Sequence, residues 1–171
     1  MPELLIGCGN SRAKMLAVPE RAAWDGLITL DHMADCAPDV VHDLAALPYP
    51  FASDSLSEIH AYDCLEHVGA QGDWRFFFAQ WSEFWRILKP GGHFMGICPK
   101  PDSPWAWGDP SHTRIISREC LTFLSQKAYE RQVGKTAMSD FRSVYKADFE
   151  LIYGADTGDG RHAFVLQAIK E

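Results

Sequence analysis

Short apolar runs in the first hundred residues predict a series of buried strands. Runs of about four to eight apolar residues bounded by turn residues are typical of strands in a packed sheet. These runs cover residues 3–6, 27–30, 39–42, 58–62 and 93–98. Three of them end at an aspartate, namely Asp31, Asp43 and Asp63. Because open α/β sheets bind ligands beyond the carboxyl ends of their strands, we expect these aspartates to face a ligand crevice.

One longer stretch has the period of a helix. Between residues 73 and 88 the apolar side chains recur at spacings of three and four, which places them on one stripe. The stripe consists of Trp74, Phe77, Phe78, Trp81, Trp85 and Leu88. Pro90 and Gly91 are expected to end the helix. We interpret this aromatic stripe as core packing against the sheet.

The remaining pattern completes an alternating α/β order. A helix is expected between the first two strands, and Ser117 is expected to cap another helix that runs to about Tyr129. The apolar runs 149–153 and 163–169 flank a turn-rich segment and predict an antiparallel hairpin. The order predicts one domain over residues 1–171, a Rossmann-like three-layer α/β sandwich whose mostly parallel sheet ends in an antiparallel β-hairpin.

Composition and charge narrow the functional classes. Hydrophobic residues make up 47% of the 171 residues, which is enough to bury a core. No apolar run approaches the roughly 20 residues of a membrane span, and the first residues lack the basic stretch of a signal peptide. The five cysteines form no CxxC pair, which favours a reduced, cytoplasmic protein without structural zinc. A net charge of −7 without a Lys/Arg cluster disfavours a nucleic-acid partner.

A glycine loop follows the first strand directly. Gly7, Cys8 and Gly9 allow the backbone to turn sharply and to approach a ligand closely. The dinucleotide fingerprint requires a third glycine where this chain has Arg12, whose side chain is expected to crowd the following helix. The loop therefore fits an amino-acid carboxylate better than the pyrophosphate of NAD. A tight turn without a ligand is the alternative.

Two of the aspartates are candidate nucleoside ligands. Asp31 lies 22 residues beyond Gly9, where a carboxylate can accept both hydroxyls of a ribose and would repel a 2′-phosphate. Asp43 can accept a hydrogen bond from an adenine amino group. The alternatives are a simple turn residue for Asp31 and an Asx turn for Asp43.

Taken together, these segments resemble the class I S-adenosylmethionine-dependent methyltransferases, and most closely a small bacterial and phage branch with an LEH motif. The resemblance covers most of residues 3–98 and is most specific in Leu65-Glu66-His67 and in the ILKPGG sequence at 87–92. It implies a seven-stranded sheet whose last strand is antiparallel.

The resemblance also implies the cofactor, S-adenosylmethionine, and its contacts. The glycine loop would line the methionine end, Asp31 would hold the ribose, and Asp43 with Leu44 would flank the adenine. Tyr62, Asp63 and Leu65 would form the floor of the site. The full set of expected cofactor contacts is Gly7, Cys8, Gly9, Asp31, His32, Asp43, Leu44, Tyr62, Asp63 and Leu65.

Glu66 and His67 are the candidate catalytic residues, since the resemblance places them near the methyl group. Methyl transfer is an in-line displacement, so the protein mainly positions the acceptor. His67 is the preferred general base because histidine exchanges a proton near neutral pH, and a structural role at the following turn is the alternative. Glu66 is expected to orient a backbone group or the cofactor, and a solvated surface position is the alternative.

The long segment 99–114 is a candidate lid or binding loop. Its DPSHTR sequence resembles a DPTH-R element of the same branch, which makes His112 and Arg114 candidate substrate contacts. Trp107, together with Trp105, is expected either to cover a planar substrate or to pack on the sheet edge.

Other chemistries fit less well. His67, His112, Asp63 and Asp109 would all lie near the crevice, but no local spacing fixes a ligand set, so no metal is expected. Neither an Asp/Asn-Pro-Pro-Tyr element nor a Pro-Cys nucleophile is present, which disfavours the methylation of nucleic-acid bases.

The sequence therefore predicts a methyltransferase acting on an unknown small-molecule or protein acceptor, with S-adenosylhomocysteine as the product. The alternatives are an inactive methyltransferase-like partner subunit and an NAD-dependent reductase. The chain begins almost at its first strand, and the link 32–38 is short. We therefore expect another chain, a second copy in a homo-oligomer, or the 99–114 loop to cover the cofactor.

Overall fold

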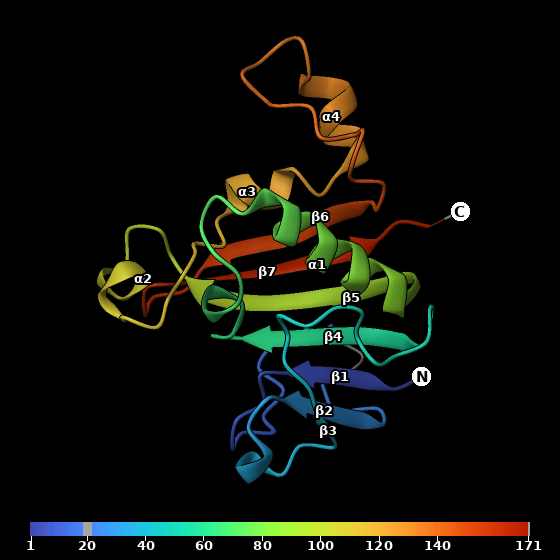
Figure 1. The fold of residues 1–171 in the computed structure, drawn as a ribbon, viewed down its shortest axis with the longest axis vertical. Coiled ribbons are helices and arrows are strands. Elements are labelled where there is room, and N and C mark those ends of the chain that lie inside the picture. The colour runs from blue at the N-terminus through green and yellow to red at the C-terminus, as the bar shows by residue number, and fades with distance from the viewer. Residues whose placement is uncertain (19–21, 171) are drawn as a thin grey trace.

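The computed structural model describes residues 1–18 and 22–170 and contains one seven-stranded sheet. The strands are β1 (Glu3–Ile6), β2 (Leu27–Asp31), β3 (Val40–Val41), β4 (Leu56–Tyr62), β5 (Leu88–Pro99), β6 (Phe149–Asp156) and β7 (Arg161–Ala168). Their order is β3-β2-β1-β4-β5-β7-β6, and β7 runs antiparallel between β5 and β6 (Figure 1). This confirms the Rossmann-like α/β fold with a mostly parallel sheet and an antiparallel terminal hairpin.

The sheet has its topological switch point at β1. The chain leaves β1 for β2 on one side, and it returns to β4 on the other side. Ile6 lies opposite Leu30 of β2 and Ala61 of β4, so the segments that follow these three strands leave the sheet at one edge. The arrowheads of β1, β2 and β4 all point toward this edge in Figure 1. Ligands of such sheets bind in the crevice at this place.

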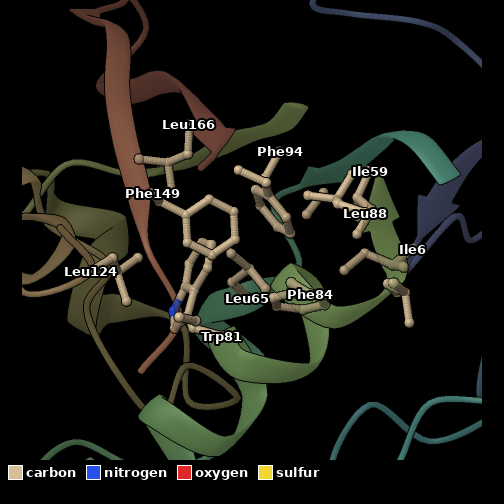
Figure 2. Packing of buried hydrophobic residues seen from close by; sticks show 14 of the residues in the cluster. Ile6, Ile59, Leu65, Trp81, Phe84, Leu88, Phe94, Leu124, Phe149 and Leu166 are labelled. Atoms are coloured by element: carbon tan, nitrogen blue, oxygen red, sulfur yellow. The ribbon is translucent and has the colours of Figure 1, made fainter. Parts of the chain in front are cut away.

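Helix α1 (Trp74–Ile87) confirms the predicted helix and the core-packing interpretation of its stripe. Asp73 caps it by accepting a hydrogen bond from the backbone N–H of Phe76. Trp81 and Phe84 are fully buried, and each ring centroid lies 4.8 Å from that of Phe94 in β5 (Figure 2). Truncating either α1 side chain would cost about 3–5 kcal/mol, which ties this helix firmly to the sheet.

The predicted helix after Ser117 is instead two short helices. Ser117 does cap the first, α3 (Arg118–Thr122), as expected. Ser125 then caps a second, α4 (Gln126–Gln132), because its hydroxyl accepts the backbone N–H of Ala128. The remaining helices are η1 (Ala34–Cys36), η2 (Leu65–His67) and α2 (Pro104–Gly108). No helix in the described chain is long and apolar enough to pass through a bilayer.

The helix expected between β1 and β2 is wrong for the residues that the structure describes there. The Tyr62 hydroxyl accepts the backbone N–H groups of Met15 and Leu16, at 3.2 and 3.1 Å, so these groups are not available to a helical ladder. The indole of Trp24 donates to the carbonyl of Arg12 at 2.7 Å. Tertiary contacts therefore hold this segment in an irregular path, and residues 19–21 lie outside the described part.

A buried charged cluster attaches this segment to the face of the sheet opposite α1. The Lys14 ammonium lies 2.7 Å from Glu3 Oε2 and 3.0 Å from Glu58 Oε2, and all three side chains are buried. His60 Nε2 lies 3.0 Å from the same Glu58 oxygen. Burial alone would raise the pKa of Glu58, but hydrogen bonds from His60 and Lys14 outweigh it and lower the pKa to about 2. The carboxylate is therefore ionised at neutral pH.

Candidate active site

A cavity of about 520 Å³ lies at the carboxyl ends of β1, β2 and β4, a size typical of small-molecule sites. The expected cofactor contacts that line it are Gly7, Gly9, Asp31, His32, Asp43, Leu44 and Asp63. It is also lined by His67 and by six residues that the sequence analysis missed, namely Met33, His42, Ala45, Cys64, Val68 and Gly69. We call this space the cofactor cavity.

The two glycines of the loop are needed for different reasons. Both have left-handed backbone angles, with φ of +59° at Gly7 and +47° at Gly9. A Cβ on Gly7 would lie 2.3 Å from the Cys64 sulfur, so packing inside the protein requires glycine there. A Cβ on Gly9 would meet nothing within 4 Å. The space beside Gly9 is therefore open on the wall of the cofactor cavity.

Asp31 is in direct contact with the glycine loop. Its Oδ2 accepts the backbone N–H of Gly9 at 2.9 Å, and its Oδ1 accepts that of Met33 at 2.9 Å. Each oxygen of a carboxylate accepts about two hydrogen bonds, and His32 Nδ1 also lies 3.3 Å from Oδ1, so Oδ2 retains the capacity for a further donor. The carboxylate thus fixes the loop and can still receive hydroxyl groups from a ligand.

Arg12 fastens the glycine loop to the segment after β2. Its guanidinium donates to the carbonyls of Gly9, Cys36 and Ala37 at 2.9, 3.0 and 3.3 Å. The expectation that Arg12 crowds a following helix is wrong, since the described chain forms no helix there. The loop offers no helix N-terminus to an anion, and its rigidity comes from the Arg12 and Asp31 contacts.

Asp43 forms an Asx turn and also lines the cofactor cavity. Its Oδ1 accepts the backbone N–H of Ala45 at 2.8 Å, as the turn alternative predicts. Leu44 beside it is buried, and its carbonyl accepts the Tyr49 hydroxyl at 3.0 Å. Both residues line the cavity, and Asp43 Oδ2 is not used in the turn, so it can accept a hydrogen bond from an adenine.

Three of the expected cofactor contacts lie outside the lining of this cavity. Cys8 is buried, with its backbone N–H bonded to the carbonyl of Leu30 at 3.4 Å. Tyr62 extends to the opposite face of the sheet, where its hydroxyl also lies 2.6 Å from His60 Nδ1. Leu65 is fully buried in the core. The resemblance implied these three contacts. Strand alternation directs the Tyr62 side chain away from this cavity and the η2 turn does so for Leu65, and a contact of these three residues with the cofactor stays a prediction.

Arg114 anchors the LEH turn from within the core. Its Nε donates to the carbonyl of Leu65 at 2.9 Å, and its guanidinium also donates to the side chain of Gln80. The neighbouring backbone N–H of Thr113 donates to the carbonyl of Glu66 at 2.8 Å. The buried side chain of Arg114 therefore holds this turn in place and does not line the cofactor cavity, and its expected contact with a substrate stays a prediction.

Glu66 is buried, which makes the surface alternative wrong. Only 2% of the residue is exposed, and neither carboxylate oxygen has a hydrogen-bond partner of ordinary geometry in the described chain. Burial raises the pKa of its carboxyl to about 7. Glu66 lines a second cavity, of about 260 Å³, together with Asp63, His112 and Arg161. We call this space the second cavity.

His67 and His112 meet between the two cavities. Their ring centroids lie 4.6 Å apart; His67 lines the cofactor cavity and His112 lines the second cavity. His67 Nδ1 lies 3.1 Å from the Ser111 hydroxyl, which connects η2 to the 99–114 loop. We call Glu66, His67 and His112 the junction cluster.

The two tryptophans of the 99–114 loop are exposed. They lie on α2, and 68% of Trp105 and 59% of Trp107 are accessible to solvent, so the alternative that they pack on the sheet edge is wrong. Trp105 lines the second cavity, whereas Trp107 lines neither of the two cavities. Covering a planar substrate remains a prediction for Trp107.

Comparison with known proteins identifies the fold. No protein-family model and no curated protein sequence matches the chain. A methyltransferase from Haloferax volcanii, solved in complex with the Trm112 methyltransferase activator, matches with a TM-score of 0.60 and 16% identity over 99% of this chain and 83% of that chain. A methyltransferase from Archaeoglobus fulgidus matches with a TM-score of 0.59 and 16% identity over 96% of this chain and 85% of that chain.

The N-methyltransferase NodS from Bradyrhizobium japonicum, solved with S-adenosylhomocysteine, matches with a TM-score of 0.56 and 13% identity over 99% of this chain and 78% of that chain. The fold is that of the S-adenosylmethionine-dependent methyltransferases. The [4+2]-cyclase SpnF shares it, with a TM-score of 0.57 and 16% identity. Because this fold also carries other chemistry, the activity has to be argued from the site.

Proposed function

We propose that this protein is an S-adenosylmethionine-dependent methyltransferase that holds its cofactor in the cofactor cavity. The observation that carries the proposal is the contact between Asp31 and Gly9 at the switch point of the sheet. This contact places a carboxylate beside an open-walled glycine loop, at the edge where this class of sheet binds ligands. The cavity volume of about 520 Å³ is sufficient for a nucleoside joined to an amino acid.

The residues fit the parts of this cofactor. The carboxylate of Asp31 would accept ribose hydroxyls, and the space beside Gly9 would admit the methionine part. Asp43 and Leu44 would flank the adenine. S-adenosylmethionine supplies a methyl group on a positively charged sulfur. The protein's contribution is to hold the acceptor in line with that group and to exclude water.

The second cavity is the proposed site of the acceptor. It adjoins the cofactor cavity through Asp63, which lines both. Its wall includes Glu66, Asp109 and Asp159, and its Arg161 is already paired with Asp63 at 2.8 Å. This acidic lining disfavours phosphate-rich acceptors, so a small molecule or a protein side chain fits better than a nucleic acid.

Methyl transfer in this arrangement needs a nearby group to take a proton. The cofactor would supply the methyl group, and an acceptor that carries a proton on its heteroatom would release that proton as it is methylated. Glu66 and His67 border the two cavities and are the side chains placed to receive it.

Calorimetric titration with S-adenosylhomocysteine tests the proposal. We expect binding, and we expect Asp31→Asn to weaken it about 10- to 100-fold, because hydrogen bonds to a charged group contribute about 1.5–3 kcal/mol. Asp25→Asn is the matched control, since the Asp25 side chain is 77% exposed, pairs with the N-terminal amine at 3.4 Å and does not line the cofactor cavity. Absence of binding at millimolar ligand, with both proteins folded by circular dichroism, would reject the proposal.

A partner subunit is the second candidate function. The Haloferax volcanii neighbour was solved in complex with a methyltransferase activator, so this fold works beside a partner in at least that case. S-adenosylhomocysteine binding without turnover on a broad acceptor panel, together with a copurifying partner, would favour this alternative.

A further inference from the structure

We propose that Glu66, His67 and His112 form a binding site for one divalent transition-metal ion, such as Zn²⁺. Each residue offers one ligand atom, and these atoms all lie within 4.8 Å of one another. Ligands of a tetrahedral zinc ion, with bonds of about 2.0–2.1 Å, are separated by about 3.4 Å. Small side-chain rotations therefore close the cluster around an ion.

The carboxylate of Glu66 is the strongest single indication of a missing cation. Buried polar groups in folded proteins almost always have partners, and an unpaired buried carboxylate is costly. Glu66 is buried, neither of its oxygens has a hydrogen-bond donor of good geometry in the described chain, and the Cys98 thiol is only a weak donor close to it. The carboxylate also lies on the wall of the second cavity, where a bound cation would supply a stronger partner.

Both histidines are oriented as metal ligands usually are. Metal-binding histidines commonly donate one ring N–H to a carbonyl or another acceptor, which leaves the other nitrogen with its lone pair for the metal. His67 Nδ1 lies 3.3 Å from the carbonyl and 3.1 Å from the hydroxyl of Ser111. His112 Nδ1 lies 3.4 Å from the carbonyl of Ala106. These contacts leave Nε2 of each ring as the ligand atom.

The junction cluster differs from a second group of possible metal ligands, whose carboxylates already have a cation beside them. Glu3, Glu58 and His60 are also close enough to one another to hold an ion. In that cluster the Lys14 ammonium already contacts both carboxylates. Neither His67 nor His112 forms such a cationic contact with Glu66 in the described chain. Among the described residues, the junction cluster therefore has no ammonium group that takes the place Lys14 has beside Glu3 and Glu58.

The donor set favours a transition metal over calcium or magnesium. Two imidazoles and one carboxylate are typical ligands of Zn²⁺ and related ions, whereas Ca²⁺ and Mg²⁺ prefer oxygen alone. Asp109 Oδ2 lies 3.8 Å from His112 Nε2 and offers a further carboxylate nearby. Three protein ligands leave a position open between the two cavities. The use of that position by an acceptor oxygen rests on the proposed methyltransferase function, but ion binding does not.

Titration of the full chain with Co²⁺ and Zn²⁺ after removal of metals with a chelator tests the site. We expect one ion per chain, visible d–d absorption for Co²⁺, and displacement of Co²⁺ by Zn²⁺. His112→Ala, His67→Ala and the nearly isosteric Glu66→Gln should each weaken binding by at least about tenfold. His93→Gln is the control, because this partly exposed histidine of β5 lines neither the cofactor cavity nor the second cavity.

Three results would overturn the metal site. The first is that no ion binds stoichiometrically. The second is that folded Glu66→Gln and His112→Ala variants bind the ion as tightly as the native protein, and the third is that His93→Gln weakens binding as much as they do. A titration with S-adenosylhomocysteine on the same samples keeps the two proposals apart. Cofactor binding without metal binding rejects only the metal site, and metal binding without cofactor binding rejects only the methyltransferase proposal.

Discussion

Gly7 and Gly9 have similar backbone angles and different surroundings, and this pair shows how single residues divide the work of the site. Gly7 packs against Cys64 inside the protein, whereas Gly9 borders open space on the wall of the cofactor cavity. One glycine therefore serves the fold, and the other leaves room for a ligand.

Alanine substitutions at these glycines should separate stability from binding. Both substitutions place a side chain at a positive φ, which costs about 1–2 kcal/mol. Gly7→Ala also forces a Cβ into the Cys64 sulfur, so we expect a further loss of about 1–3 kcal/mol in the free energy of unfolding. Gly9→Ala should retain more stability but weaken S-adenosylhomocysteine binding. Urea denaturation and calorimetry measure the two effects, and equal losses of stability would contradict the assigned roles.

The site was predictable from the sequence where it depends on local spacing. The spacing of 22 residues between Gly9 and Asp31 is that of one connection between two neighbouring parallel strands, and the structure brings these two residues into contact. The junction cluster was not predictable in this way. His112 reaches Glu66 and His67 only because the 99–114 segment folds back onto η2, through the hydrogen bond from Thr113 to the Glu66 carbonyl. No local spacing encodes that contact.

At the scale of elements, the segment between β1 and β2 shows tertiary contacts overriding a helical expectation. Alternating α/β patterns favour a helix after the first strand. Here the Tyr62 hydroxyl takes two backbone N–H groups of the segment, and Lys14 is drawn to two buried glutamates. The partners come from β1 and β4, so the sequence of the segment itself gave no sign of them. By contrast, α1 carries its own signal in its aromatic stripe and was predicted almost to the residue.

Removing the Lys14 charge should detach this segment and change how stability depends on pH. Lys14→Met leaves Glu3 and Glu58 buried without their cation, which typically costs about 3–5 kcal/mol at neutral pH. In the native protein the pKa of Glu58 is lowered to about 2, so its stabilising contribution is present above the ordinary value of 4.5 and is lost as the pH falls toward 2.

In Lys14→Met this dependence on pH should weaken. Loss of the ammonium removes part of what lowers the pKa of Glu58, while the hydrogen bond from His60 remains, so the pKa should rise from about 2 and acidification should cost the variant less stability than the native protein. The difference in unfolding free energy between the two proteins should therefore shrink from pH 7 to pH 4. Urea denaturation across this range measures it, with Lys127→Met as an exposed control. If this difference in unfolding free energy stays constant between pH 7 and pH 4, the buried Lys14–Glu58 pair is not the source of the pH dependence.

At the scale of the whole molecule, the sheet, α1 and the 99–114 loop place two cavities on either side of one cluster of ionisable side chains. The cofactor cavity lies at the switch point, where the fold binds ligands, and the second cavity adjoins it through Asp63. This arrangement matches what a transfer reaction between two bound molecules requires. The identity of the acceptor depends on the second cavity, whose lining comes largely from a loop that the fold leaves free to vary.

A crystal structure of the protein grown with S-adenosylhomocysteine tests the central claim most directly. We expect the ribose hydroxyls within hydrogen-bond distance of Asp31, the amino-acid end beside Gly9, and the sulfur facing the junction cluster. Ligand bound elsewhere on the molecule, or a cofactor cavity filled by the protein's own side chains, would contradict the account.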